Sequence, residues 1–432
     1  MSRIKLTIDA ELQKLQQEAF RYFLHETNLS NGLVVDKTAA NWPASIAVIG
    51  LALTSYPVAV ERGFISRAAA VERILTTLRF FWHSRQGPEA DATGYKGFYY
   101  HFLDMQTGQR AWQSELSTVD SAFLLAGMLA VGRYFDTSTA DEQEIRTLAD
   151  ALYRRADWQW IQNQGATLTH GWTPENGFLP FRWEGYDEAL LLYTLALGSP
   201  TYPLPESSYT AWVSTYEWKS YYNYDYLYAG PLFTHQLSHV WIDFRKIQDA
   251  FMQEKGIDYF ENSRRATYVQ QQYAIHNPFK FVGYSACCWG ITASDGPGPD
   301  TLKIHGIERQ FFDYIGRGVP YGPDDGTVAP WAALTSLPFA PDIVLPVFEH
   351  YSYTLKLREG HLYGFRGTFN QTYPEKTHSC GWVSPWHYGL NIGPIILMVE
   401  NYRTGLLWAL MRGCPYIVSG LRRAGFSGGW LR

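Results

Sequence analysis

The sequence predicts an all-α fold: an (α/α)6 barrel, or toroid, with a ring of six inner helices, six outer helices around it, and long aromatic-rich loops at one end. Helical segments alternate between amphipathic, charged stretches and almost wholly apolar ones, as expected of outer and inner helices. Few stretches show the two-residue alternation of strands. No Ser/Gly-rich spacer or charge block divides the chain, so we expect a single domain over residues 1–432, although this length often holds two or three domains.

The elements follow in order from local patterns. Leu12, Leu15 and Ala19 recur at three- and four-residue intervals, which predicts an amphipathic helix over residues 9–26. The apolar run after Trp42 predicts an inner helix, and Ser66 caps the outer helix that follows. A short strand pair is expected near residues 94–104. The remaining helices, alternately inner and outer, span residues 115–135, 139–162, 185–197, 205–216, 231–253, 257–275, 328–337, 342–357 and 392–411.

The loops before the apolar segments are rich in aromatic, acidic and histidine residues. In a ring of helices these loops lie at the same end, so the pattern predicts an active-site funnel there. The residues that introduce the six apolar segments are Trp42, Glu115 and those in ranges 183–188, 235–239, 324–331 and 382–391.

Composition excludes several classes of function. The formal net charge is −5 and no basic stripe is present, which argues against nucleic acid and against an anionic membrane as partners. Aromatic residues make up 16% of the chain, many of them in Gly/Pro-rich loops, which favours a ring-lined cleft for a neutral ligand. No nucleophile elbow, phosphate loop or dinucleotide fingerprint is present, so we expect no cofactor.

The cysteines and the first residues bear on the compartment. Cys287, Cys288, Cys380 and Cys414 include no C-x-x-C pair, so neither a disulfide framework nor a zinc site is expected. The start of the sequence has charges where a signal peptide needs an apolar core. We therefore expect a cytoplasmic protein, or a periplasmic or secreted one if a leader was removed. The oligomeric state stays open.

The stretch 172–193, W-T-P-E-N-G-F-L-P-F-R-W-E-G-Y-D-E-A-L-L-L-Y, carries the strongest functional signal. If a helix starts by Gly185, the carboxylates of Glu184 and Glu188 project from its mouth on nearly the same side. Acids in a first turn can simply complement the helix dipole. Here Trp172, Phe178, Phe181, Trp183 and Tyr186 surround them, and flat apolar faces beside acids suit a site that cleaves sugars.

Other candidate residues each have a structural alternative. Glu115 lies at a predicted helix mouth, whereas Asp120 fits a capping box with Ser117 as well as catalysis. His235 and His239 share a helix face but lack a third ligand and a nearby general base, so we expect no metal there, and a contact to sugar or a structural role instead. The remaining expected substrate contacts are His101, Trp172, Trp183, Tyr186, Trp289, Asp295, Asp325 and Trp331, of which the two aspartates also fit plain turns.

Long motifs resemble a known family. The stretches E-L-S-T-V-D (115–120), G-W-T-P-E-N-G-F-L (171–179), W-E-G-Y-D-E-A-L-L-L-Y (183–193), P-L-F-T-H-Q-L-S-H (231–239), D-Y-F-E-N-S-R (258–264) and W-G-I-T-A-S-D-G-P (289–297) are similar to the bacterial glucoamylase-like group. That group includes endo-β-1,2-glucanases of glycoside hydrolase family 144 and the transglycosylating domain of cyclic β-1,2-glucan synthases. The resemblance implies an (α/α)6 barrel, and the family's G-Y-x-E-A pattern falls on Gly185 to Ala189.

The sequence therefore predicts an endo-acting, inverting glycoside hydrolase, with β-1,2-glucan as the substrate. Glu188 is the expected general acid and Glu115 or Asp120 the base, because inversion needs two carboxyl groups roughly 6.5–9.5 Å apart. One alternative is a retaining transglycosylase with a gap of about 5–5.5 Å. Another is a catalytically silent glycan-binding protein.

Overall fold

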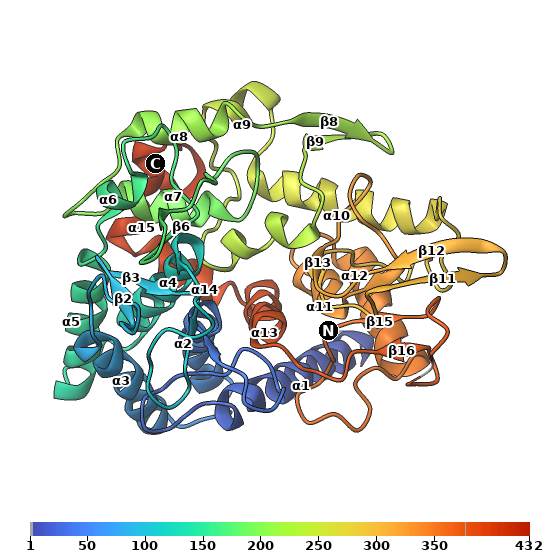
Figure 1. Cartoon of the computed structure of the whole chain (residues 1–432), viewed down its shortest axis with the longest axis horizontal. Coiled ribbons are helices and arrows are strands. Elements are labelled where there is room, and N and C mark those ends of the chain that lie inside the picture. Colours follow the sequence, from blue (N-terminus) through green and yellow to red (C-terminus); the bar gives the residue numbers. More distant parts are fainter. Residues whose placement is uncertain (1–2, 376) are drawn as a thin grey trace.

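Helices form most of the regular structure in the computed structural model, which describes residues 3–375 and 377–432 (Figure 1). The mostly apolar segments are almost entirely buried, as their composition predicts. In chain order they are α2 (Ile46–Glu61), α4 (Thr118–Tyr134), α7 (Ala189–Gly198), the 3-10 turns η1 (Leu232–His235) and η2 (Leu237–Val240), α11 (Pro330–Thr335) and α13 (Gly389–Arg403).

These segments pack against one another in the middle of the molecule. Helix α2 contacts α4 and α13, α4 contacts α7, and η2 contacts both α7 and α13, while α11 lies beside α13. Two glycines let α2 and α4 approach backbone to backbone. A Cβ on Gly50 would lie 2.2 Å from the carbonyl oxygen of Phe123, and one on Gly127 would lie 2.2 Å from the carbonyl oxygen of Gly50.

Amphipathic helices cover this centre. Ser66, Thr139 and Asp258 each accept a hydrogen bond from a backbone N–H in the first turn of the following helix, as N-caps do. The covering helices are α1 (Arg3–His25), α3 (Arg67–His83), α5 (Ala140–Arg154), α8 (Glu206–Val213), α10 (Tyr259–His276) and α12 (Pro341–Glu349). The other helical segments are α6 (Trp158–Gln162), α9 (Ala250–Lys255), the π-helical turn η3 (His350–Thr354), α14 (Leu406–Arg412), α15 (Pro415–Arg423) and η4 (Gly429–Leu431).

Several expected helix boundaries are wrong. The helix expected over residues 231–253 is two 3-10 turns and a loop that leads to α9. The helix expected over residues 392–411 is divided by Gly405, whose φ of 71° is left-handed. Helix α7 begins at Ala189 rather than near Gly185, since Gly185 has a φ of 76° and the Asp187 carboxylate accepts the Ala189 N–H.

A small antiparallel sheet lies against the helices and supports the helix starts. It has the order β2 (Gly94–Tyr95), β3 (Phe98–Tyr100), β5 (Leu116–Ser117), β6 (Gly171–Thr173) and β7 (Gly177–Phe178), so the expected strand pair is confirmed. The other strands are β1 (Ala44–Ser45), β4 (Phe102–Leu103), β8 (Trp218–Tyr221), β9 (Tyr224–Leu227), β10 (Ala293–Ser294), β11 (Asp300–Ile304), β12 (Ile307–Phe311), β13 (Ile315–Gly316), β14 (Thr327–Val328), β15 (Phe369–Asn370) and β16 (Trp382–Val383). Across residues 3–375 and 377–432, no helix combines the length and the apolar character needed to cross a bilayer.

Candidate active site

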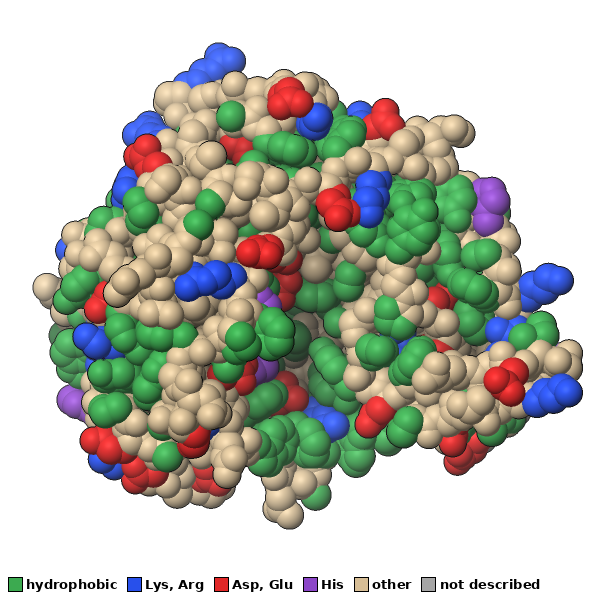
Figure 2. All heavy atoms as spheres, turned by 45° about the horizontal axis from the view of Figure 1, so that its top comes forward, with side chains coloured by type: hydrophobic (Ala, Val, Ile, Leu, Met, Phe, Trp, Pro, Cys, Tyr) green, Lys and Arg blue, Asp and Glu red, His purple; other side chains and the backbone are tan. Residues whose placement is uncertain are grey.

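A cleft opens where the N-terminal ends of the central helices meet. Its walls include Ser45 before α2, Asp120 in α4, Glu188 before α7, Trp331 in α11 and Asn391 in α13. Five helix starts therefore face one cleft, which is the convergence that the sequence predicts. Figure 2 shows the hollow near the middle of the face it presents, with acidic and histidine side chains on one side and hydrophobic side chains around it.

The cleft has two lobes. The Glu188 lobe has a volume of about 270 Å³, and the Trp112 lobe has a volume of about 460 Å³. Side chains that line the Glu188 lobe include Glu115, Phe123, His170, Trp183, Glu188 and Trp331. Side chains that line the Trp112 lobe include Asp36, Lys37, Trp42, Trp112, Asp295, Asp313 and Tyr388. Both lobes share His101, Asp120, Tyr314, Leu390 and Asn391, which makes them one continuous site.

The small sheet sets His101 opposite Glu115. Tyr100 in β3 pairs with Leu116 in β5, and the His101 N–H donates to the Glu115 carbonyl at 2.9 Å. The side chains then meet, with Nδ1 of His101 3.0 Å from Oε1 of Glu115. On its other side, Nε2 of His101 lies 3.6 Å from Oδ2 of Asp120. One imidazole thus lies between the two carboxylates that the sequence proposes as bases.

In this cluster, the positive charge of His101 and the negative charges of the carboxylates stabilise each other. Burial alone would lower the pKa of His101, but the carboxylates of Asp120, Glu115 and Asp36 raise it to about 9. Burial acts to raise the pKa of Glu115, yet its hydrogen bond to His101 and the charge of that ring hold the pKa below its usual value. At neutral pH the cluster therefore holds a protonated His101 beside an ionised Glu115.

Asp120 belongs both to the helix start and to the cleft. Ser117 is the N-cap of α4 and accepts the Asp120 N–H, and its hydroxyl also contacts the Asp120 carboxylate. The same carboxylate lines both lobes and faces His101. The cap that the sequence suggests is therefore made mainly by Ser117, and it leaves Asp120 facing the cleft.

Glu188 is partly buried at the N-cap position of α7 and makes no capping hydrogen bond with its side chain. Burial, and then the charge of Asp120, raise the pKa of Glu188 to about 7. Glu184 does not share this position, because α7 starts one turn later than expected and leaves Glu184 exposed outside both lobes. A carboxyl group that keeps its proton near neutral pH can act as a general acid.

Some expected substrate contacts do line the cleft. Trp183 stacks on His170 with ring centroids 4.1 Å apart, and its Nε1–H donates to the Thr118 hydroxyl at 2.9 Å. Trp331 lies in the same lobe. Asp295 lies in the Trp112 lobe, where it accepts hydrogen bonds from Thr368 and Ser384.

Other expected contacts lie away from the cleft, in packed surroundings. His235 and His239 are each 1% exposed, and burial lowers their pKa values to about 4 and about 3, so both rings are neutral parts of the core. Trp289 is fully buried. Asp325 forms a buried ion pair with Arg317 at 2.8 Å.

Two further aromatic residues expected at the substrate pack against other rings instead. Trp172 in β6 packs against Tyr95 and Trp160, with ring centroids 5.4 and 5.8 Å away. Tyr186 stacks on Tyr259 with centroids 5.9 Å apart and is 6% exposed. Neither ring lines the two lobes.

The structure adds residues that sequence reasoning missed. Asp36 lies beside the Trp112 lobe, where burial raises its pKa to about 6 although His101, the Trp42 N–H and Lys37 oppose the shift. The Lys37 ammonium lies 3.9 Å from the Trp42 ring centroid. The signal in the sequence is the Asp36-Lys37 pair just before the Trp42 mouth.

The spacing of the cluster also raises the question of a metal. His101, Glu115 and Asp120 each offer a ligand atom, and these atoms lie within 4.8 Å of one another. A ring with a pKa of about 9 carries a proton on both nitrogens at neutral pH, so a cation would have to displace one of these protons to bind there. The absence of a metal stays a prediction.

Comparisons with known proteins identify the relatives. The family model described as "Putative glucoamylase" matches residues 180–415. A crystal structure from Bacteroides uniformis, described in the same words, is 30% identical with a TM-score of 0.86 and covers 98% of this chain and 99% of its own. An endo-β-1,2-glucanase from Chitinophaga pinensis, solved with sophorotriose and glucose, shares the fold at 24% identity with a TM-score of 0.85, covering 98% of this chain and 99% of its own.

One curated relative has a named activity. It is an exo β-1,2-glucooligosaccharide sophorohydrolase, acting at the non-reducing end, from Parabacteroides distasonis. It is 29% identical over 96% of this chain, and this chain spans 58% of its length.

Proposed function

The chain belongs to the glucoamylase-like family described as "Putative glucoamylase", and on this premise we propose that it is a glycoside hydrolase acting on β-1,2-linked glucan. The names of the Parabacteroides and Chitinophaga relatives support this linkage. A neutral glucan also suits a cleft whose walls combine aromatic rings with carboxylates.

The observation that carries the proposal is the contrast between Glu188 and the His101 cluster. The pKa of Glu188 is raised to about 7, so Glu188 stays largely protonated below that pH, whereas Glu115, which lines the same lobe, is ionised there. Glu188 would protonate the glycosidic oxygen as the bond to the anomeric carbon breaks. An ionised carboxylate would take a proton from the water that attacks that carbon, with inversion.

We propose Asp120 as that base. Its charge raises the pKa of Glu188, and its carboxylate lies at the junction of the two lobes, where the reacting sugar would sit. Glu115 lines only the Glu188 lobe and not the Trp112 lobe, and its carboxylate is hydrogen-bonded to His101. Its role would be to orient the protonated ring toward Asp120.

Endo action is the form of cleavage that two lobes favour, since sugar units can then lie on both sides of Asp120. The alternatives that the test must separate are exo action, as in the name of the Parabacteroides relative, and retaining transglycosylation.

The architecture proposed for the chain is a single (α/α)6 barrel over residues 1–432. The packing of α2, α4, α7, η2, α11 and α13 around the centre, with amphipathic helices outside, supports it.

The test is a panel of β-linked and α-linked glucans, with release of reducing ends and the product sizes measured. We expect release from β-1,2-glucan, oligosaccharides of mixed length, and products that initially have the anomeric configuration opposite to the substrate by NMR. Cleavage of another linkage would overturn the proposed substrate. Release of disaccharide alone would establish exo action, and a retained configuration would assign a double-displacement mechanism.

A further inference from the structure

One exposed tryptophan at the cleft sits in a backbone conformation that tryptophan seldom adopts. The turn from Ala111 to Ser114 closes with the Ser114 N–H donating to the Ala111 carbonyl at 3.0 Å. Its two central residues, Trp112 and Gln113, have φ values of 56° and 54°. Left-handed φ at both positions is the signature of a type I′ turn, for which Asn-Gly is the preferred pair. A bulky residue in this region is strained.

The side chain of Arg110, just before the turn, holds the turn in place. The Arg110 side chain is 2% exposed and donates to the Ser114 carbonyl at 2.5 Å and to the Gln113 carbonyl at 2.6 Å. The same guanidinium pairs with Glu175 at 2.7 Å and lies over the Tyr100 ring. A strained conformation persists only where its surroundings determine it, and Arg110 supplies that support.

The turn held by Arg110 places the ring of Trp112 at the cleft. Trp112 is 55% exposed and lines the Trp112 lobe. The rings of Trp112 and Trp42 pack edge to face with centroids 4.7 Å apart at 78°, and the Phe102 centroid lies 5.1 Å away. These contacts fix the ring yet leave more than half of it open. Turn stability does not explain a tryptophan here, whereas a flat apolar surface for a sugar does.

We propose that Trp112 is a stacking platform that binds a glucose unit of the glucan away from Glu188, and so sets the preference for chain length. Trp112 lines the lobe that does not contain Glu188, and the two lobes are joined at His101 and Asp120. A chain bound across Asp120 that is long enough to fill the Trp112 lobe reaches this ring, and a short one does not. The inference rests on the proposed function, because it takes the ligand to be a β-1,2-glucan.

The test measures binding of β-1,2-linked glucooligosaccharides of increasing length by calorimetry, in a Glu188→Gln background that prevents cleavage. We expect Trp112→Ala to raise Kd for the longer oligosaccharides about 3- to 10-fold, with a smaller effect on the shortest ones that bind. The control is Trp82→Ala, because Trp82 is 40% exposed on α3 and lies outside both lobes. It should leave every Kd unchanged.

A second variant separates a platform from a structural residue. Asparagine tolerates left-handed φ but has no ring, so Trp112→Asn should weaken binding as Trp112→Ala does while the midpoint of thermal unfolding stays equal or rises. A lower midpoint for Trp112→Asn, or unchanged Kd values for long oligosaccharides in both variants, would overturn the proposal. If the parent protein binds no β-1,2-glucooligosaccharide, both this proposal and the proposed function fail. If it binds them and the Trp112 variants bind equally well, only the platform fails.

Discussion

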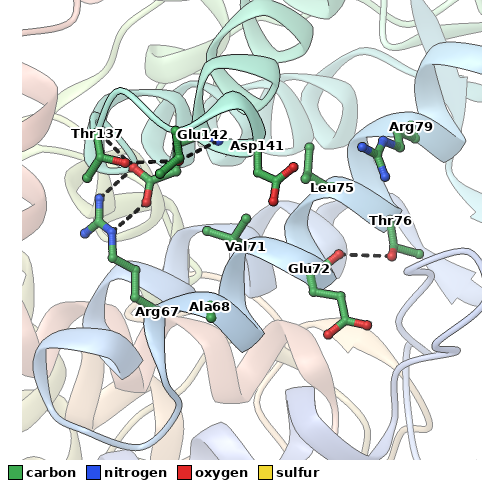
Figure 3. A pocket seen from close by; sticks show the side chains of 11 residues that line it. Arg67, Ala68, Val71, Glu72, Leu75, Thr76, Arg79, Thr137, Asp141 and Glu142 are labelled. Atoms are coloured by element: carbon green, nitrogen blue, oxygen red, sulfur yellow. Dashed lines mark hydrogen bonds and ion pairs between the residues drawn. The ribbon is translucent and has the colours of Figure 1, made fainter.

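The groove between α3 and α5 holds the buried carboxyl group of Glu142, and the cleft at the helix starts holds the partly buried carboxyl groups of Glu188 and Asp36, whose pKa values shift in the direction opposite to that of Glu142. In the groove, Arg67 hydrogen-bonds Glu142 at 2.7 Å and holds its pKa at about 2 against burial (Figure 3). In the cleft, burial raises the pKa of Glu188 to about 7 and that of Asp36 to about 6.

Volume alone would not identify the cleft, and not the groove, as the functional site. The α3–α5 groove has a volume of about 710 Å³, compared with about 270 and 460 Å³ for the two lobes. What distinguishes the cleft is that Glu188 and Asp36 are partly buried without an arginine beside them, whereas Glu142 is paired with one. Carboxyl groups of the first kind can change protonation during a reaction near neutral pH, and those of the second kind stay ionised.

The largest expected effect compares the same substitution in the two hollows. Glu188→Gln removes the proposed proton donor and should lower turnover of β-1,2-glucan about 100- to 10,000-fold, while oligosaccharide affinity changes little. Glu142→Gln should keep turnover near that of the original protein, because Glu142 lies outside the cleft. Steady-state kinetics and calorimetry of both variants check this. Equal losses of turnover would show that neither loss reports on acid catalysis.

The next effect concerns stability in the groove. Arg67→Met leaves Glu142 buried without its partner and should lower the free energy of unfolding by about 1–3 kcal/mol at pH 7. The folded pKa of Glu142 is about 2, below its unfolded value, so this stabilisation is present above about pH 4.5 and is lost as the pH falls toward 2. Urea unfolding at several pH values should show the difference between the two proteins shrink over that range. A difference that does not depend on pH would point to lost packing instead.

The His101 cluster should give an effect of about tenfold. His101→Asn removes the positive charge that lies 3.6 Å from the carboxylate of the proposed base, Asp120, and beside Glu115, so the ionised carboxylates of this cluster lose their cationic partner. The acidic limb of kcat/KM should then move to higher pH, and at pH values low on that limb kcat/KM should fall roughly tenfold for a shift of about one unit. The pH profiles of the two proteins provide the measurement. An unchanged acidic limb would remove His101 from the electrostatics of the site.

The smallest effect is a gain in stability in the cleft. The pKa of Asp36 is raised to about 6, so its ionisation costs stability as the pH rises from its unfolded value through 6. Asp36→Asn removes that cost and should stabilise the fold by on the order of 1 kcal/mol at pH 8, and by much less at pH 4. Thermal unfolding at both pH values tests the sign. A variant that is less stable at pH 8 would mean that the Asp36 carboxylate is better paired than its burial indicates.

Much of the fold follows from local patterns, and the errors of the prediction arise where tertiary contacts override those patterns. The alternation of apolar and charged segments predicts which helices lie inside. It does not predict that Gly405 takes a left-handed φ and divides the last apolar run, or that residues 232–240 form 3-10 turns. Both depend on how the chain meets its neighbours and not on hydrophobic period.

The site was predictable where a residue adjoins a helix start. Glu188, Glu115 and Asp120 precede or begin apolar helices, and the structure brings them to one cleft. His235, His239 and Trp289 come from equally promising loops, yet their side chains turn into the core. The sequence shows that a ring or an acid is in a loop, but the side to which it points depends on tertiary packing. For the same reason, Trp112 could be recognised only in the structure.

General acid catalysis by Glu188 requires its proton, and the basic limb of kcat/KM on β-1,2-glucan reports on the loss of that proton. Because the acid must be protonated in the free enzyme, kcat/KM should fall as the pH rises through about 7, and the limb should be weaker for a substrate with an activated leaving group. A profile that stays flat to pH 9, or a limb equally steep for both substrates, would contradict the assignment of Glu188 as the general acid.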